Sequence, residues 1–224
     1  MNNDLIQIVF VIDKSGSMRD LTDDTVGGFN AFIEKYKNES IAGLLTVTLF
    51  DDKFRFLHDQ AVLTDAAFMT REAYMEGGMG MTALYDAIGA TIDQVGKRLA
   101  SMQEEDRPGK VLFVITTDGY ENASQHYNRD QVKGMIQHQS EKYNWEFIFL
   151  GANLDSEETA WSIGINSNRA MNYSADSKGV CSVYNLVAEV GREYACSTAE
   201  NACATLDCAL ASMKDSNGYI SQSV

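Results

Sequence analysis

One apolar stretch near the start of the chain ends abruptly in a polar turn. Residues 8–12 are β-branched or aromatic, and they are followed by Asp13, Ser15 and Ser17, spaced two apart. An unbroken apolar run of this kind is typical of a strand that is buried on both faces of a parallel sheet. One carboxylate and two hydroxyls directly after it suit a hard cation such as Mg²⁺. Taken alone, a turn that caps the next helix explains the pattern about as well.

A second buried strand ends in the same way. Residues 111–116 are apolar or β-branched, and Asp118 follows them closely. A glycine-rich loop at residues 77–82 lies between the two strands in the sequence and ends in Thr82. Because ligands of parallel sheets bind outside the carboxyl ends of the strands, we expect Asp118 and Thr82 to converge with the oxygens that follow residue 12.

The order of the elements predicts an α/β fold with a parallel sheet covered by helices on both faces. A very short link at residues 51–53 can only fold the chain back, so the third strand is expected to run antiparallel to the second. The expected strands cover residues 8–12, 44–50, 54–57, 111–116, 147–150 and 169–173. The expected helices cover residues 21–37, 66–74, 83–99, a weaker one around 132–140, 156–163, 180–194 and about 198–214.

These elements together resemble the von Willebrand factor A domain and its metal-ion-dependent adhesion site. Asp13, Ser15 and Ser17 match the D-x-S-x-S element, Thr82 matches the threonine loop, and Asp118 matches the final aspartate. The resemblance covers roughly residues 5 to 193, and all five motif positions are filled. It implies a doubly wound, mostly parallel six-stranded sheet of order 3-2-1-4-5-6. The motif sequences D-K-S-G-S-M and T-A-L-Y-D-A-I are similar to those of bacterial and phage members of the family.

The resemblance also implies a mode of metal binding. Ser15, Ser17 and, in the ligand-ready state, Thr82 would coordinate Mg²⁺ directly, while Asp13 and Asp118 would act mostly through bound water. Mn²⁺ could replace Mg²⁺, whereas Ca²⁺ is less suited to the site. With little direct anionic charge around it, the ion would accept a carboxylate from a partner protein. The expected partner-binding rim consists of Met79, Met81, Tyr120, Glu121 and Asn122.

Two other function classes fit parts of the same pattern. A Mg²⁺-dependent enzyme for phosphoryl transfer or hydrolysis would use the carboxylates, but residues 89–97 lack the spacing of a nucleotide-binding loop. A phosphatase with Asp13 as nucleophile would normally want a carboxylate where Ser15 stands. A structural assembly subunit with a permanently filled metal site is the third class. We therefore expect a metal-dependent protein-binding module, not an enzyme.

Charge and composition restrict the partners. The chain of 224 residues has 18 basic and 32 acidic residues, so its net charge is −14. This charge disfavours nucleic acids and anionic membrane surfaces as partners. Residues 1–4 lack the features of a signal peptide, and no apolar run has membrane-spanning length, so we expect a cytoplasmic protein.

The last quarter of the chain predicts a helical extension beyond the domain. We expect a von Willebrand factor A domain over residues 1–195 and a C-terminal helix and tail over residues 196–224. Residues 197–200 have the spacing of a capping box. The following stripe is predicted to pack against the domain or against a second copy of the chain, and it consists of Cys203, Leu206, Leu210 and Met213.

The cysteines all lie in this last quarter. They are Cys181, Cys196, Cys203 and Cys208, and no pair has C-x-x-C spacing. His58, His126 and His138 are far upstream, so a zinc site is not expected. We expect the cysteines to be small buried thiols in a reducing compartment.

Overall fold

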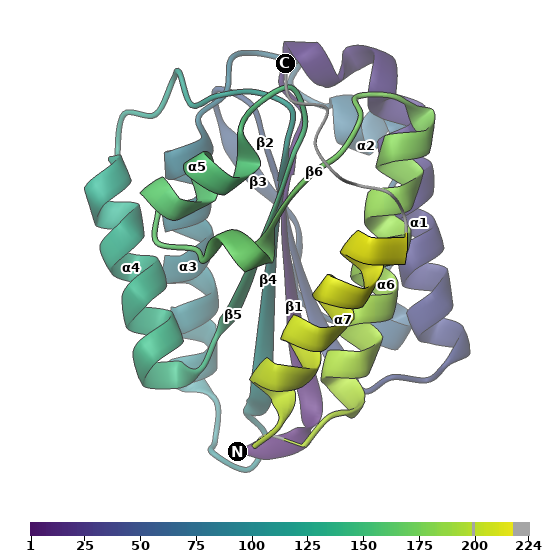
Figure 1. Cartoon of the computed structure of the whole chain (residues 1–224), viewed down its shortest axis with the longest axis vertical. Coiled ribbons are helices and arrows are strands. Elements are labelled where there is room, and N and C mark those ends of the chain that lie inside the picture. Colours follow the sequence, from purple (N-terminus) through teal and green to yellow (C-terminus); the bar gives the residue numbers. More distant parts are fainter. Residues whose placement is uncertain (199, 217–224) are drawn as a thin grey trace.

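The computed structural model of the protein describes residues 1–198 and 200–216, with the side chains of residues 213–216 excepted. The strands are β1 (Asn2–Asp13), β2 (Gly43–Phe50), β3 (Phe54–Val62), β4 (Pro108–Thr117), β5 (Glu146–Gly151) and β6 (Ala170–Asn172) (Figure 1). The α-helices are α1 (Thr22–Asn38), α2 (Arg71–Met75), α3 (Leu84–Ser101), α4 (Arg129–Tyr143), α5 (Ser156–Ser162), α6 (Ser177–Cys196) and α7 (Ala202–Ser216). Short 3₁₀ turns are η1 (Gly16–Leu21), η2 (Leu63–Asp65) and η3 (Ser167–Arg169).

The strands form a single sheet in the order β3-β2-β1-β4-β5-β6. β1 is central and runs parallel to β2 and β4, with Ile8 opposite Leu45 on one side and Leu112 on the other. Only β3 is antiparallel to its neighbour, β2. The predicted fold class, including the antiparallel third strand, is confirmed.

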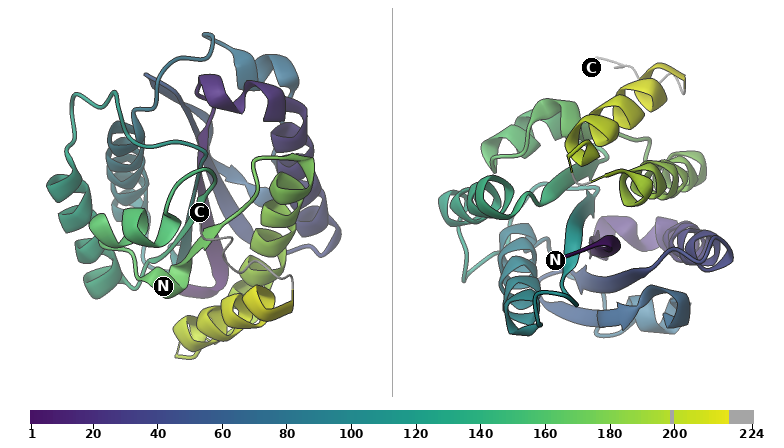
Figure 2. Two further views of the ribbon diagram at one scale, coloured as in Figure 1. Left: turned by 45° about the horizontal axis from the view of Figure 1, so that its top comes forward. Right: turned by 90° about the horizontal axis from the view of Figure 1, so that it is seen from below.

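The sheet separates two apolar cores, and β1 contributes alternate side chains to each. Phe10 and Ile12 belong to the core under α1 and α6. Val9 and Val11 belong to the core under α3 and α4. Figure 2 shows these two helix layers on opposite faces of the sheet. Successive residues of a strand point to opposite faces, so a strand covered on both sides must be apolar throughout.

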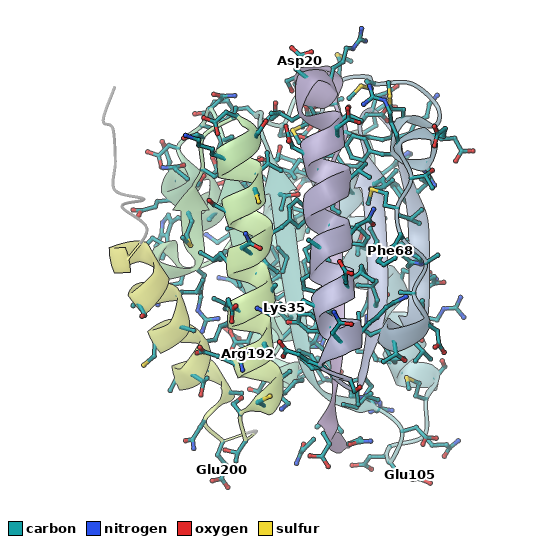
Figure 3. All side chains as sticks on the ribbon, turned by 90° about the vertical axis from the view of Figure 1, so that its right-hand side faces the viewer. Asp20, Lys35, Phe68, Glu105, Arg192 and Glu200 are labelled. Atoms are coloured by element: carbon teal, nitrogen blue, oxygen red, sulfur yellow. The ribbon has the colours of Figure 1, made fainter. Side chains whose placement is uncertain are left out.

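Helices α1 and α6 pack closely against each other over the sheet. Beneath them, Phe10 of β1 and Phe32 of α1 meet edge to face with ring centroids 4.9 Å apart. A Cβ built on Gly28 would lie 2.5 Å from the ring of Tyr184, so this position needs glycine for the close approach of the two helices. Ion pairs from Lys35 and Arg192 to the α6 carboxylate of Glu189 cover the outside of the contact (Figure 3).

The helix predicted for residues 66–74 is shorter than expected. Only Arg71–Met75 is helical, and the Thr70 side chain accepts a hydrogen bond from the backbone N–H of Ala73 at 3.1 Å. Upstream, the amide of Asn30 exchanges two hydrogen bonds with the backbone of Met69, each at 2.8 Å. These tertiary bonds satisfy the backbone of Met69 outside a helix.

Helix α7 packs against the rest of the chain, as predicted, and Leu206 and Leu210 of the predicted stripe are buried. Its buried residues are Ala202, Leu206, Ala209 and Leu210. The prediction was wrong for Cys203, which is exposed, and the side chain of Met213 lies outside the described part. The buried guanidinium of Arg169 joins Asp207 of α7 to Glu146 of β5, with N–O distances of 2.8 Å to each.

The predicted capping box at residues 197–200 does not form. The Ser197 hydroxyl donates instead to the carbonyl of Tyr194 at 2.7 Å, which closes the end of α6. Helix α7 begins at Ala202, and its first turn uses the carbonyl of Asn201 as acceptor for Thr205 N–H. Of the predicted extension, residues 199 and 217–224 lie outside the described part of the chain.

The expectation of buried cysteines was also wrong, because all four thiols are free and exposed. On α6, the buried stripe includes Val180 and Tyr184, and each residue step turns by about 100° around the helix axis. Cys181 therefore points away from the stripe. The small size and apolar character of cysteine therefore did not predict the helix face on which these side chains lie. Among the described residues, no helix has both the length and the apolar content that crossing a bilayer requires.

Candidate metal centre

The first part of the candidate site is the end of β1. Asp13 is the last residue of the strand and is completely buried. Its Oδ1 accepts a hydrogen bond from the backbone N–H of Ser15 at 2.7 Å, which is the local bond of an Asx turn. The turn places the hydroxyl oxygens of Ser15 and Ser17 3.2 Å apart. A single aspartate thus shapes the loop that presents both hydroxyls.

The end of β4 lies directly beside this loop. The strands pair with Ile12 opposite Thr116, so the residues after each strand meet at one edge. The Thr117 hydroxyl donates to Asp13 Oδ2 at 2.6 Å, and the Ser17 hydroxyl donates to Asp118 Oδ1 at 2.6 Å. The predicted convergence of the two strand ends is therefore present in the structure.

The threonine loop completes the arrangement. Gly16 N–H donates to the carbonyl of Gly80 at 2.9 Å, which joins this loop to the β1 turn. Thr82 is buried, and a Cβ built on Gly119 would lie 3.8 Å from its hydroxyl oxygen. The hydroxyl therefore lies beside the end of β4. All five predicted ligand positions come from these three segments, which the fold brings together.

A buried ion pair that the sequence analysis did not identify fixes the threonine loop. Lys14 Nζ lies 2.5 Å from Asp51 Oδ2 and 2.7 Å from the carbonyl oxygen of Gly78, and both charged side chains are 4% exposed. Asp51 also accepts from the backbone N–H groups of Lys53 and Gly80. Burial acts to raise the pKa of Asp51, but these bonds outweigh it and hold the pKa below its usual value. Asp51 comes directly after β2 and Asp13 is the last residue of β1, so an acidic residue at the end of a buried strand was the signal in the sequence that could have identified Asp51.

Two more acidic residues hold the segment after β4, and one of them was predicted for a different role. Asp86, in the first turn of α3, accepts from the backbone N–H groups of Gln125, His126 and Tyr127. Glu121, expected on the partner-binding rim, accepts from the N–H groups of Tyr85, Ala123 and Ser124 and from the Ser124 hydroxyl. Both carboxylates therefore have internal partners.

The other rim residues differ in exposure. Asn122 exchanges backbone and side-chain hydrogen bonds with Thr82, so it positions the threonine loop. Met79 is partly buried and packs against the core under α1 and α6. Met81 and Tyr120 are each 59% exposed, so both are large apolar side chains available for contact with a partner. The role of all five in partner binding stays a prediction.

The two site carboxylates are buried, and neither forms an ion pair with a cationic side chain in the described part of the chain. Burial raises the pKa of Asp13 to about 6, although hydrogen bonds from Thr117 and Ser15 act in the opposite direction. Burial also raises the pKa of Asp118, against the hydrogen bond from Ser17. The nearby ammonium of Lys14 is bound to Asp51. A cation at this edge would relieve the electrostatic penalty on both carboxylates.

The donor set fits a hard metal ion. It consists of two carboxylates and three hydroxyls, and oxygen ligands of this kind suit Mg²⁺. Within the described ranges, no group of three or more histidine, cysteine, aspartate or glutamate side chains could hold a metal ion. A metal at this site would therefore depend on the hydroxyls of Ser15, Ser17 and Thr82.

Comparison with known proteins gives similarity at the level of fold. No protein-family model matches the sequence, and no curated protein matches it. Among solved structures, the pilus adhesin SpaC from Lactobacillus rhamnosus GG aligns with a TM-score of 0.63 at 12% identity, over 82% of this chain and 30% of that chain. Proximal thread matrix protein 1 from the mussel byssus, in a structure described as having a zinc-occupied MIDAS motif, aligns at 0.55 and 15% identity, over 83% and 45%.

A third similar structure carries the fold name itself. A von Willebrand factor type A protein from Catenulispora acidiphila aligns with a TM-score of 0.54 at 13% identity, over 84% of this chain and 42% of that chain. This chain thus spans less than half the length of each of the three. The strand order and the antiparallel β3 match the fold that these alignments indicate. The chain has the fold of the von Willebrand factor A domain.

Proposed function

We propose that the protein is a metal-dependent protein-binding module, with Mg²⁺ held where β1, β4 and the threonine loop meet. The hydrogen bond from Ser17 to Asp118 carries the proposal most directly. It joins residues 101 positions apart at 2.6 Å, between a buried carboxylate and a hydroxyl that would both serve the ion. The similarity to a structure with a zinc-occupied MIDAS motif supports a metal-binding role in general.

The residues divide into direct and indirect ligands. Ser15, Ser17 and Thr82 would bind the ion through neutral oxygens. Asp13 would act mostly through bound water, and the bonds that its two oxygens accept from Ser15 N–H and the Thr117 hydroxyl fix its position. Asp118 would do the same while orienting Ser17. A bound ion would carry a positive charge that only two indirect carboxylates would neutralise, so the site would favour an additional anionic ligand.

We further propose that a partner's aspartate or glutamate side chain provides this ligand. The net charge of −14 opposes a broadly acidic partner, so the carboxylate should lie within a neutral or basic surface. Met81 and Tyr120 are exposed beside the site and would supply apolar contacts around it. The similarity to a pilus adhesin supports a binding role at the level of fold.

Binding, not turnover, is the activity that we propose. A phosphatase with Asp13 as nucleophile would normally have a second carboxylate where Ser15 stands. Two other acids near the site, Asp86 and Glu121, accept hydrogen bonds from backbone N–H groups. Assays of phosphatase and nucleotidase activity in Mg²⁺ test this point directly, and metal-dependent turnover lost in Asp118→Ala would contradict it.

The remaining sequence-based proposals concern context. The exposed free thiols favour a reducing compartment, so we propose a cytoplasmic location. The bacterial or phage origin and the division into residues 1–195 and 196–224 also remain proposals. Self-association through α7 is less well supported, because Leu206 and Leu210 are already buried within the chain.

The first experiment uses the metal alone. Calorimetric titration of the purified chain should detect Mg²⁺ or Mn²⁺ binding, with weaker Ca²⁺ binding, and Asp118→Ala should abolish it. Asp106→Ala is the matched control, because Asp106 is an exposed aspartate just before the opposite end of β4. Equal metal binding by Asp118→Ala and the wild type would contradict the proposed site.

The second experiment concerns the partner. A pull-down with immobilised protein should retain a partner in Mg²⁺ and release it in EDTA. Partner affinity is then measured by calorimetry in Mg²⁺, Ca²⁺ and EDTA. Equal affinity in all three would mean that the contact lies elsewhere on the surface, even if the first experiment finds the metal.

A further inference from the structure

A small cavity lies in the core directly beneath the candidate metal centre. It has a volume of about 10 Å³ for water-sized spheres, which is roughly the room that one water molecule requires. It lies between α1, the end of β4 and the start of α6. Met18, the residue after Ser17, forms part of its wall, and Thr116, two residues before Asp118, forms another.

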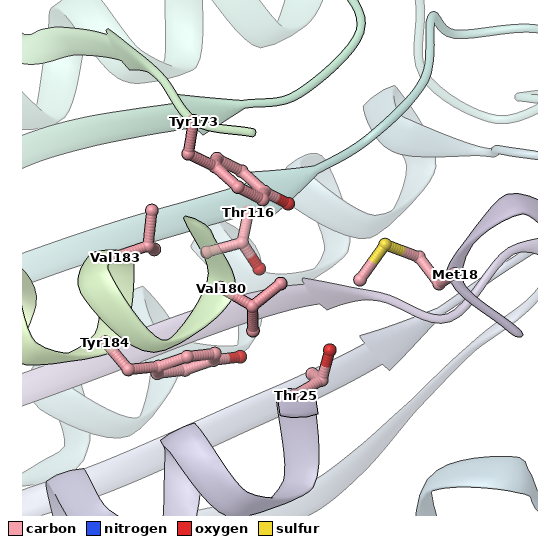
Figure 4. Close-up of a pocket in the computed structure, with 7 residues that line it drawn as sticks. All are labelled: Met18, Thr25, Thr116, Tyr173, Val180, Val183 and Tyr184. Atoms are coloured by element: carbon pink, nitrogen blue, oxygen red, sulfur yellow. The ribbon is translucent and has the colours of Figure 1, made fainter. Parts of the chain in front are cut away.

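The cavity is lined by hydroxyl groups that have no partner. Among the described residues, eight buried side-chain nitrogen or oxygen atoms lack a hydrogen bond. Three of the eight are Thr25 Oγ1, Thr116 Oγ1 and Tyr184 OH, and all three residues line this one cavity. They are 1%, 5% and 3% exposed, so bulk water does not satisfy them. Figure 4 shows their hydroxyls facing a common space.

The three hydroxyls come from three different elements and are held in place. Thr25 belongs to α1, Thr116 to β4 and Tyr184 to α6. The Tyr184 ring lies over Gly28 so closely that any Cβ there would be 2.5 Å from it, which limits movement of the ring towards α1. Much of the remaining wall is apolar, including Met18 and Val180. The Thr116 hydroxyl lies near enough to Tyr184 to act against the rise in pKa that burial causes there, but none of the three hydroxyls makes a hydrogen bond of good geometry to the others.

We propose that this cavity is a binding site for one structural water molecule, which bridges Thr25, Thr116 and Tyr184. Water can both donate and accept, so one molecule can satisfy three hydroxyls whose protons are free to rotate. Buried waters in proteins typically make about three hydrogen bonds to groups that would otherwise be unpaired, whereas empty cavities are apolar. The water joins α1, β4 and α6 beneath the loop that carries Ser17. This site is independent of the proposed metal function.

The direct test is a crystal structure of the wild-type protein at a resolution that shows ordered internal water. A single density peak is expected at hydrogen-bond distance, about 2.7–3.0 Å, from all three hydroxyl oxygens. An empty cavity in such a structure would overturn the proposal. So would direct hydrogen bonds among the three hydroxyls.

A solution test uses magnetic relaxation dispersion of water ¹⁷O, which counts long-lived internal waters. The triple variant Thr25→Val, Thr116→Val, Tyr184→Phe keeps the side-chain shapes but removes every hydroxyl, and it should contain one long-lived water fewer than the wild type. Tyr194→Phe is the matched control on α6, because Tyr194 is a buried tyrosine whose hydroxyl donates to Val111 outside the cavity. An unchanged count in the triple variant would overturn the proposal.

Thermal unfolding adds a readout that a dry cavity would not give. Each single variant removes one of three bonds to the water, and we expect it to lower Tm by roughly 2–4 °C. The triple variant leaves no unpaired group behind, so its Tm should fall by clearly less than the sum of the single changes. Strict additivity would contradict a shared water.

Discussion

Asp13 is the residue at which burial and charge conflict most strongly. It is fully buried, and its pKa is raised from 3.8 to about 6 mainly by burial. An aspartate with a raised pKa contributes stability that is fully present below its unfolded pKa and is lost as the pH rises through its folded pKa. Without a metal ion, Asp13 therefore opposes folding at neutral pH.

This sign leads to a prediction for Asp13→Asn, which keeps the side-chain shape and the acceptor for Ser15. In EDTA, the variant should gain stability over the wild type as the pH rises from about 4 to 7. A shift of about two units corresponds to a gain on the order of 3 kcal/mol. Urea unfolding of both proteins at each pH measures it. A difference that does not change with pH would contradict the raised pKa.

Thr82 leads to a separate prediction about direct coordination. Thr82→Val removes the hydroxyl and keeps the shape, so metal affinity should fall modestly while partner affinity should fall by at least about tenfold more. Thr82→Ser should restore most of both, because it returns the hydroxyl. Calorimetry with the metal and then with the partner separates the two effects. Equal losses in both titrations would count against a role in the ligand-ready state.

At the scale of elements, the glycine-rich loop has little apolar packing of its own and depends on polar ties. Its ties to the sheet are the Lys14–Asp51 pair, the bond from Gly16 to Gly80 and the exchange between Thr82 and Asn122. A buried ion pair contributes little net stability, but removal of one partner leaves an uncompensated charge.

We therefore predict that Lys14→Met lowers the free energy of unfolding by roughly 3–5 kcal/mol. Lys14→Met combined with Asp51→Asn should lose less than Lys14→Met alone, because it removes the uncompensated carboxylate. Arg71→Ala is the matched control, since its pair with Asp23 is exposed and should contribute at most about 1 kcal/mol. Chemical denaturation measures all three. A loss for Lys14→Met no larger than for the control would refute the role of the pair.

Helix α7 allows a prediction about its attachment. Leu206→Ala or Leu210→Ala should destabilise the protein by roughly 2–5 kcal/mol, because both side chains are buried against the chain. Ala204→Ser, at an exposed position of the same helix, should change stability by no more than about 0.5 kcal/mol. If thermal unfolding gives similar values for all three variants, α7 does not contribute to the stability of the domain.

What could be predicted from the sequence depends on how local each signal is. The buried run that ends in Asp13 and the one that ends before Asp118 indicate their strands directly, and the edge at which both end follows from the parallel order. The partners of Lys14 and Asp86 are other side chains and backbone groups of distant loops, which periodicity does not report. The prediction that the cysteines are buried failed because the small size and apolar character of a side chain do not determine which face of a helix it occupies.

At the scale of the whole molecule, the candidate site joins three parts of the chain that are far apart in sequence. A metal bound there interacts with the folded state and not with the unfolded chain. At 100 times its dissociation constant, Mg²⁺ should add about 2.7 kcal/mol to the free energy of unfolding. We expect a rise in Tm of roughly 5–10 °C. The combined variant Asp13→Ala, Asp118→Ala should show no rise, and an unchanged response would refute the assignment.

The first strand lies in the centre of the sheet, so it can pair fully only with a strand that the ribosome makes much later. β1 is made first, yet its neighbour β4 pairs Lys110 with Ile6, about a hundred residues later. At a synthesis rate of roughly 5–20 residues per second, the side of β1 that pairs with β4 stays unpaired for several seconds. During that interval the nascent chain carries an apolar strand with unpaired N–H and C=O groups, which is a template for pairing with other chains. Pairing of that side of β1 is complete only when residue 117, the last of β4, has been made.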